Sequence, residues 1–153
     1  DYFTYVSECI EKYGLSPALL ELEVTETQAI TDYERIRHSL QRFAALGIKI
    51  SLDDFGTGYS SLAHISNITA HCIKIDRSFV SQLETDENSQ HVINMILNLG
   101  KKFNFTIVAE GIETDYQKQW LTKMGCDVGQ GYLFAKPMVT DELIEWLSTF
   151  NKN

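Results

Sequence analysis

The stretch IKISLDD, residues 48–54, is the part of the sequence that decides the fold. Its first five residues form a short, mostly apolar run, and Gly47 separates this run from the segment before it. A run of this length, bounded by a glycine, predicts a strand that is buried on both faces, as in a parallel sheet. Asp53 and Asp54 follow at once, so the strand is expected to end in two adjacent acids.

Short apolar runs of this kind alternate with longer segments whose apolar residues recur at helical period. Strands are expected at residues 19–25, 48–52, 72–75, 106–109 and 126–128. Helices are expected at residues 31–46, 62–65, 89–103 and 115–124, and near Thr140. This alternation predicts an α/β domain in which helices cover a parallel sheet. No linker or repeat interrupts it, so we expect residues 1–153 to belong to one domain.

Composition excludes several classes of protein. The 153 residues carry a net charge of -8, and binding to DNA through counterion release needs a basic face. The chain has no run of about 18 apolar residues, so no membrane contact is expected from this segment, and we expect a cytoplasmic location. Cys9, Cys72 and Cys126 are widely spaced and form no CxxC pair, which favours buried, inert thiols in a reducing compartment.

Polar side chains lie at the ends of all five expected strands: Glu23, Glu26, Asp53, Asp54, Lys74, Asp76, Glu110 and Gln130. In parallel α/β barrels the carboxyl ends of the strands meet on one face, where sites form. Converging carboxylates repel one another unless cations lie between them, and carboxylate oxygens suit Mg²⁺ or Mn²⁺. An adjacent Asp pair can serve two metal ions, which lie about 3.5–4 Å apart in two-metal sites. A lysine beside them can neutralise developing charge.

Each of these features also has a purely structural interpretation. An isolated Asp-Asp pair is typical of a turn or a helix cap, and the glycines of DFGTGYSS suit an ordinary turn. Charged residues at strand ends are usually solvated, although a lysine in a central strand is seldom buried without a partner. The four histidines lack ligand spacing. From the residues alone, the prediction is a metal-dependent enzyme that acts on a phosphate ester.

Five segments match a known family in order: LELEVTET, LDDFGTGYSSL, IKIDRSFV, VAEGIET and GCDVGQGYLFAKP. With them the sequence closely resembles the EAL domain, the bacterial cyclic-di-GMP phosphodiesterase family. The resemblance implies a modified TIM (β/α)8 barrel, of which this chain is the C-terminal part with about five βα units. It also implies hydrolysis of cyclic-di-GMP to linear pGpG with Mg²⁺ or Mn²⁺.

The resemblance assigns a role in the site to each strand-end residue except Asp76. Glu23, Asp53 and Asp54 resemble metal ligands, with Asp53 shared between the two ions. Lys74 resembles the lysine that holds the attacking water and has been considered as a base, and Glu110 resembles the glutamate that assists at the second metal.

Two further roles concern the edge of the site. Gln130 resembles a glutamine near the substrate, and Glu26 resembles the glutamate that anchors the loop after the Asp pair. That loop resembles the one that couples dimerisation to metal binding, and it comprises Phe55, Gly56, Thr57, Gly58, Tyr59, Ser60 and Ser61.

The sequence departs from the family in one respect. The Glu-Ala-Leu motif and an Asn-containing strand, both of which supply metal ligands in the family, are not among these residues. The first barrel strands are therefore expected to be missing, and the isolated chain is expected to have little activity. The alternative is a degenerate, non-catalytic EAL module that binds cyclic-di-GMP or a protein partner. Family members also imply a homodimer, through residues 76–79 and the helix from Ser89, and an upstream sensory or GGDEF domain.

Overall fold

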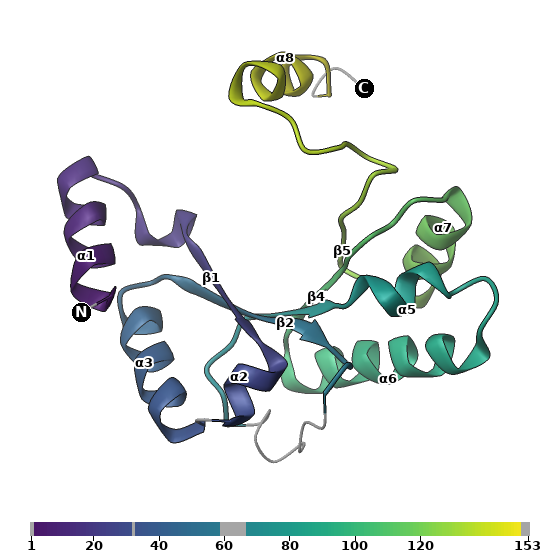
Figure 1. The fold of residues 1–153 in the computed structure, drawn as a ribbon, viewed down its shortest axis with the longest axis horizontal. Helices are drawn as coiled ribbons and strands as arrows, with labels where there is room; N and C mark the ends of the chain where they lie inside the picture. The colour runs from purple at the N-terminus through teal and green to yellow at the C-terminus, as the bar shows by residue number, and fades with distance from the viewer. Residues whose placement is uncertain (1, 32, 59–66, 151–153) are drawn as a thin grey trace.

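A single sheet of five parallel strands, in chain order, organises the computed structural model (Figure 1). The structure describes residues 2–31, 33–58 and 67–150. The strands are β1 (Glu21–Thr25), β2 (Lys49–Phe55), β3 (Cys72–Ile75), β4 (Thr106–Ala109) and β5 (Val128–Gly129). Each strand pairs in parallel with the next, as in the wall of a TIM barrel. Within the described residues, the outer edges of β1 and β5 have no strand beside them, so the wall stays open.

Helices connect the strands, and several of them cover one face of this wall. They are α1 (Tyr2–Tyr13), α2 (Glu26–Thr31), α3 (Tyr33–Ala45), α5 (Arg77–Ser81), α6 (Glu87–Phe103), α7 (Asp115–Met124) and α8 (Thr140–Phe150), with a short 3-10 helix η1 (Pro17–Leu19). Helix α3 contacts β2, and α6 contacts both β3 and β4. Figure 1 shows α3 and α6 along the same side of the sheet.

The alternation of side chains along each strand separates the core from the site. Ile50 and Leu52 of β2, with Ile73 and Ile75 of β3, are at most 2% exposed and belong to the hydrophobic core. The residues between them, including Ser51, Asp53 and Lys74, therefore point to the opposite face. The apolar runs of the sequence thus place the polar strand residues together on the concave side.

Side-chain caps set the bounds of α6 and α7. Asp86 accepts hydrogen bonds from the backbone N–H groups of Asn88 and Ser89 at the start of α6. Thr114 and Gln117 form a reciprocal capping box at the start of α7. Gly125 ends α7 in the left-handed region with φ +82°, which a glycine adopts at little cost.

The expected elements agree with the structure in type and differ at some bounds. The helix expected at residues 31–46 corresponds to α3, while α1, α2 and α5 were not expected. The expected strand at 126–128 begins at Val128, because the Asp127 side chain, not its backbone, accepts the hydrogen bond from the N–H of Ile107 at 2.8 Å. The last helix begins at Thr140 as expected. The expected helix at residues 62–65 lies outside the described residues.

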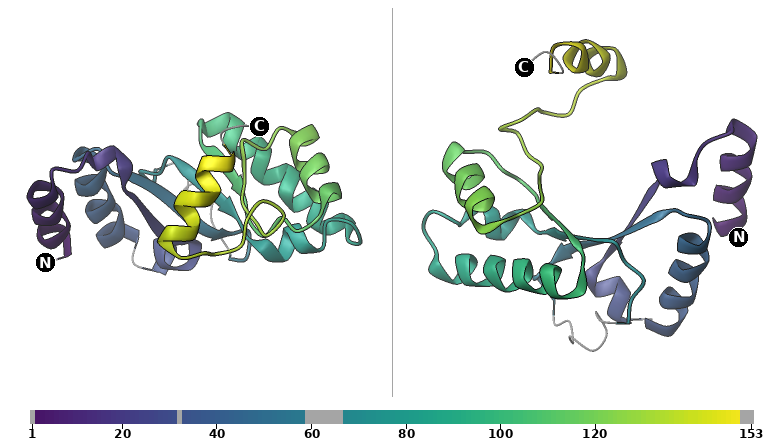
Figure 2. Two further views of the ribbon diagram at one scale, coloured as in Figure 1. Left: turned by 90° about the horizontal axis from the view of Figure 1, so that it is seen from above. Right: turned by 180° about the vertical axis from the view of Figure 1, so that it is seen from behind.

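Helix α8 stands apart from the sheet at the end of an extended segment (Figure 2). It contributes no buried residue, and Leu143, Ile144 and Leu147 are exposed. Among the described residues, no helix is both long enough and apolar enough to cross a membrane.

Candidate active site

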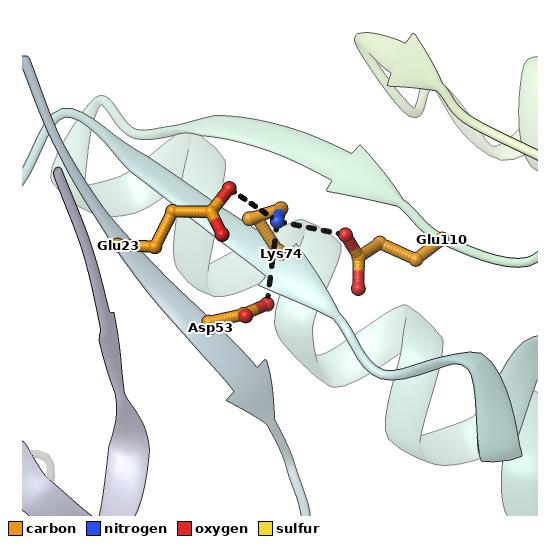
Figure 3. A network of polar contacts seen from close by, with 4 residues as sticks. All are labelled: Glu23, Asp53, Lys74 and Glu110. Carbon is orange, nitrogen blue, oxygen red and sulfur yellow. Dashed lines mark hydrogen bonds and ion pairs between the residues drawn. The ribbon is translucent and has the colours of Figure 1, made fainter. Parts of the chain in front are cut away.

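Lys74 lies at the centre of three carboxylates that come from three different strands or strand ends (Figure 3). Its Nζ is 2.5 Å from Glu23 Oε1, 2.8 Å from Glu110 Oε1 and 3.5 Å from Asp53 Oδ1. The lysine side chain is 9% exposed, whereas those of Glu110, Asp53 and Glu23 are 18%, 21% and 51% exposed. We call Lys74 with Glu23, Asp53 and Glu110 the Lys74 centre. Three negative charges and one positive charge give it a net charge of -2.

The electrostatics of the Lys74 centre keep its lysine protonated. Burial by itself would lower the pKa of Lys74, but the hydrogen bonds to Glu110 and Glu23 and the charge of Asp53 outweigh burial and raise it. Lys74 is therefore a cation in this metal-free arrangement, because its carboxylate partners stabilise the charged form. Its role in the reaction, as the residue that holds the water or as a base, stays a prediction.

A bulge between β2 and β3 brings the Asp pair to the Lys74 centre. Leu52 pairs with Ile73 and Phe55 pairs with Ile75, so Asp53 and Asp54 together lie opposite the single residue Lys74. Adjacent residues of a regular strand would point to opposite faces. Asp54 instead turns with φ +54°, a left-handed conformation that aspartate tolerates better than most residues.

Asp54 has a different environment from Asp53. Desolvation, followed by the charges of Asp53 and Asp76, raises the pKa of Asp54. Asp76 also accepts hydrogen bonds from the backbone N–H and the hydroxyl of Ser78, and so caps α5. The structure therefore forms a second acidic group beside the Lys74 centre. Asp76 follows β3 directly in the sequence and was expected among the strand-end polar side chains, but the family resemblance assigned it no role in the site.

Glu26 holds the loop that follows the Asp pair. Glu26 is only 3% exposed, and its Oε2 accepts hydrogen bonds from the backbone N–H of Gly56 at 2.8 Å and of Gly58 at 3.2 Å. A Cβ atom at Gly58 would lie 2.9 Å from Glu26 Oε1, so the close approach requires glycine. Residues 55–58 of the expected loop are described, whereas Tyr59, Ser60 and Ser61 lie outside the described residues.

Gln130 follows β5 beside Glu110. Its backbone N–H donates to the carbonyl of Ala109 at 2.9 Å, which extends the pairing of β4 and β5 to the level of the Lys74 centre. The Gln130 side chain is exposed. The next residue, Gly131, packs so tightly that a Cβ atom there would lie 2.1 Å from the carbonyl oxygen of Ile112.

The donor set fits a hard divalent cation in its chemistry. Glu23, Asp53, Asp54 and Glu110 offer carboxylate oxygens, the ligands that Mg²⁺ and Mn²⁺ prefer. Asp53 Oδ1 is buried and makes no hydrogen bond, although it lies within ion-pair distance of Lys74, so it keeps a lone pair for a ligand. Across the described parts of the chain, no three carboxylate, imidazole or thiolate groups converge tightly enough to hold an ion. The ammonium group of Lys74 occupies the position between the carboxylates of Glu23, Asp53 and Glu110.

The cysteines take no part in this site. None of the three forms a disulfide, and Cys72 is buried. Desolvation raises the pKa of Cys72 to about 11 and also raises that of Cys126. These thiols are therefore poor nucleophiles, which agrees with the expectation from the sequence.

Comparison with known proteins decides the family. A sequence model described as the EAL domain matches residues 1–137. The chain belongs to the EAL domain family. It is 40% identical over 139 residues to the bifunctional diguanylate cyclase/cyclic di-GMP phosphodiesterase MucR of Pseudomonas aeruginosa, which covers 91% of this chain and 20% of MucR. The chain spans about a fifth of the length of the curated relatives it matches.

Solved structures of EAL proteins share the fold. The MucR phosphodiesterase in its c-di-GMP complex superposes with a TM-score of 0.88 at 40% identity, covering 90% of this chain and 56% of that one. The manganese/cy-diGMP complex of Klebsiella pneumoniae BlrP1 gives a TM-score of 0.82 at 31% identity, covering 90% and 35% of the two chains. These EAL structures confirm the expected α/β, TIM-barrel-like architecture for the five-stranded sheet.

Three features of this EAL site were not predicted from the sequence. They are the interaction of Asp54 with Asp76, the burial of the Ser51 hydroxyl without a hydrogen-bond partner, and the contact of Phe79 with Gly56. The alternation of β2 places Ser51 and Asp53 on one face, so a strand pattern alone could have found Ser51. The other two depend on the bulge and on the turn after β2.

Proposed function

We propose that this chain supplies metal ligands and catalytic side chains to a cyclic-di-GMP phosphodiesterase site. The observation that carries the proposal is the Lys74 centre, in which carboxylates of neighbouring parallel strands surround one lysine at the carboxyl end of an EAL sheet. The relative MucR, a bifunctional diguanylate cyclase/cyclic di-GMP phosphodiesterase, and the c-di-GMP complex of its phosphodiesterase support the substrate.

The metal would be held by Glu23, Asp53 and Asp54. Their oxygens suit Mg²⁺ or Mn²⁺, and the free lone pair of Asp53 Oδ1 supports Asp53 as a ligand. The structural relative BlrP1 was solved with manganese, which supports a divalent cation. When bound, such ions polarise a phosphoryl oxygen and lower the pKa of a bound water.

The chain's own residues would act on the phosphate of the substrate. In the reaction, the oxygen of water forms a bond to phosphorus, the bond from phosphorus to the ribose 3′ oxygen breaks, and that oxygen leaves with a proton as a hydroxyl group. Lys74, as a cation, stabilises the negative charge that builds up on the phosphoryl oxygens and orients the water. Glu110 keeps Lys74 in place through its 2.8 Å contact. Gln130 contacts the substrate at the rim.

The loop after β2 would connect this site to a second subunit. Glu26 anchors Gly56 and Gly58, and a Cβ atom at Gly56 would meet the Phe79 ring of α5 at 2.9 Å. Any shift of α5 would therefore move the loop next to Asp54. This supports a homodimer through α5 and α6, where Met95 is 63% exposed. Because MucR is a bifunctional diguanylate cyclase/phosphodiesterase, we also propose an upstream sensory or GGDEF domain. The free thiols support a cytoplasmic location.

The experiment is hydrolysis of cyclic-di-GMP with Mg²⁺ or Mn²⁺. We would assay the 153 residues alone and a chimera in which they replace the matching residues of the MucR phosphodiesterase. The chimera is expected to produce linear pGpG. The isolated chain is expected to produce little, because its sheet is open beside Glu23, which is half-exposed.

Matched variants separate the enzyme from a binding module. Asp53→Asn and Lys74→Met in the chimera should each lower kcat by at least about 100-fold, while Glu34→Gln on the outer surface should leave it unchanged. A chimera that binds cyclic-di-GMP but does not hydrolyse it would instead support the non-catalytic alternative.

A further inference from the structure

Lys74 occupies the position that its three carboxylate partners face, and a divalent cation would need the same oxygens. An ammonium group has three N–H donors, and here they face Glu23 at 2.5 Å, Glu110 at 2.8 Å and Asp53 at 3.5 Å (Figure 3). Two of these partners, Glu23 and Asp53, are the side chains proposed as metal ligands. The lysine and a metal ion therefore compete for them.

We infer that Lys74 is the counterion that holds the carboxylates together in the metal-free protein, and that its ammonium group leaves Glu23 and Asp53 when a divalent cation binds. This inference rests on the metal site of the proposed function, but it concerns a step that precedes catalysis. It assigns Lys74 a role in the assembly of the site, in addition to any role in the chemistry.

Repulsion between the carboxylates requires such a counterion. Glu23, Asp53 and Glu110 all lie within 3.5 Å of one nitrogen atom, so their oxygens are near neighbours. Asp54 and Asp76 add further negative charge at the same edge of the sheet. Without a cation in the centre, these side chains would turn outward to solvent. Lys74 therefore keeps the three carboxylates paired at this end of the sheet in the metal-free protein.

The contacts of Lys74 with Glu23 and Asp53 also oppose the binding of a metal ion. A cation that binds Glu23 and Asp53 must break their contacts with Lys74, and it must then tolerate a positive charge only a few ångströms away. Glu110 offers the lysine an alternative, because it lies on the other side of Nζ, at the end of β4, and is not among the proposed ligands of this first ion. Lys74 can thus stay paired with Glu110 while it releases the other two carboxylates.

The first test is the affinity of the full 153-residue chain for Mn²⁺, measured by electron paramagnetic resonance of the free ion. Lys74→Met keeps the length and the apolar stem of the side chain but removes its charge. We expect it to bind Mn²⁺ about 10–100-fold more tightly than the wild type, whereas Lys74→Arg should not gain affinity. Lys123→Met, far from the site on α7, is the matched control. Equal or weaker binding by Lys74→Met, or no binding by either chain, would overturn the inference.

A second measurement needs no variant and holds even if Lys74→Met fails to fold. In the metal-free wild type, the ammonium protons of Lys74 should exchange slowly with water, because they are buried and hydrogen-bonded. Mg²⁺ should shift the ¹⁵Nζ resonance and speed this exchange, while Lys123 should not change. A Lys74 signal that is unaffected by saturating Mg²⁺ would contradict the inference. A different result would contradict the proposed function, namely that the chimera does not hydrolyse cyclic-di-GMP.

Discussion

The carboxylate of Glu26 accepts a hydrogen bond from the backbone N–H of Gly56 at 2.8 Å, although the two residues are 30 positions apart in the chain. Glu26 is the first residue of α2, and Gly56 begins the turn after the Asp pair. The buried carboxylate also accepts from Gly58, so a single side chain at the end of β1 determines the path of the chain beyond Asp54. The position of the Asp54 carboxylate therefore depends on a residue that does not belong to the Lys74 centre.

Removal of that anchor should loosen the loop more than it unfolds the sheet. Glu26→Ala leaves two partly buried N–H groups without their acceptor, so we expect a loss of about 2–4 kcal/mol in the free energy of unfolding. Amide hydrogen exchange at Gly56 and Gly58 should accelerate strongly. Glu34→Ala, whose side chain forms only a surface ion pair with Arg37, should cost about 0–1 kcal/mol. If the two variants were equal in stability and exchange, the anchoring role would be wrong.

Asp54→Asn should stabilise the chain in the absence of metal. The pKa of Asp54 is raised by desolvation and by Asp53 and Asp76, so its charged form is less favourable in the folded state than in the unfolded one. Asparagine removes the charge and still tolerates φ +54°. We expect Tm in EDTA at pH 7 to rise by about 1–3 °C. The gain should vanish as the pH falls below 3.8, where the carboxyl is protonated in both states.

A matched aspartate shows whether this gain is specific. Asp115 lies in the first turn of α7, where a negative charge is favourable. Asp115→Asn should therefore leave Tm unchanged or lower it slightly. A fall in Tm for Asp54→Asn would show that its carboxylate stabilises the metal-free fold, against the expectation.

The cap of α6 should contribute pH-dependent stability. Hydrogen bonds from Ser89, through its side chain and backbone, lower the pKa of Asp86 from 3.8. A carboxyl with a lowered pKa stabilises the fold above its unfolded value, and this contribution is lost as the pH falls through the folded value. Asp86→Asn keeps a capping side chain but carries no charge. Urea unfolding should show that the wild type has the larger free energy of unfolding at pH 7. The difference from Asp86→Asn should shrink below pH 3.8. A difference that stayed constant with pH would be inconsistent with this.

The capping box of α7 should behave as one unit. Gln117 is 5% exposed, and its Oε1 accepts from the backbone N–H groups of Glu113 at 2.7 Å and Thr114 at 3.1 Å. We expect Gln117→Ala to cost about 1–3 kcal/mol and Thr114→Ala about 1 kcal/mol in free energy of unfolding. Because the two share hydrogen bonds, the double variant should cost less than the sum, by at least about 0.5 kcal/mol. Strict additivity would show that the two residues act independently.

Much of the fold was predictable because its strands are short apolar runs. Residues 72–75 and 106–109 were expected as strands and are β3 and β4, and α7 has the expected bounds. Helix α1 was missed although it is amphipathic, and it contributes no buried residue. Helix α2 was also missed; it begins at Glu26, whose carboxylate accepts the hydrogen bond from Gly56, a tertiary contact that helical periodicity does not record.

The sequence indicated which residues lie together at the strand ends, but it indicated less about how they are arranged. Strand-end position indicated Glu23, Asp53, Lys74 and Glu110, and parallel pairing explains why they meet. The pairing of Lys74 with Glu23, Asp53 and Glu110 was not predictable, because it depends on three distances between strands that are distant in sequence. The roles assigned to these four residues, and to Glu26, Asp54, Gln130 and the loop, remain predictions.

The bulge at Asp53 and Asp54 also bears on how the gene can change. Removal of the single codon for Asp54 would leave Asp53 opposite Lys74 and Phe55 opposite Ile75, a regular ladder with the core positions unchanged. It would also remove a residue at positive φ. We therefore expect a one-residue deletion here to be tolerated by the fold, with the loss of the second acid as its main consequence.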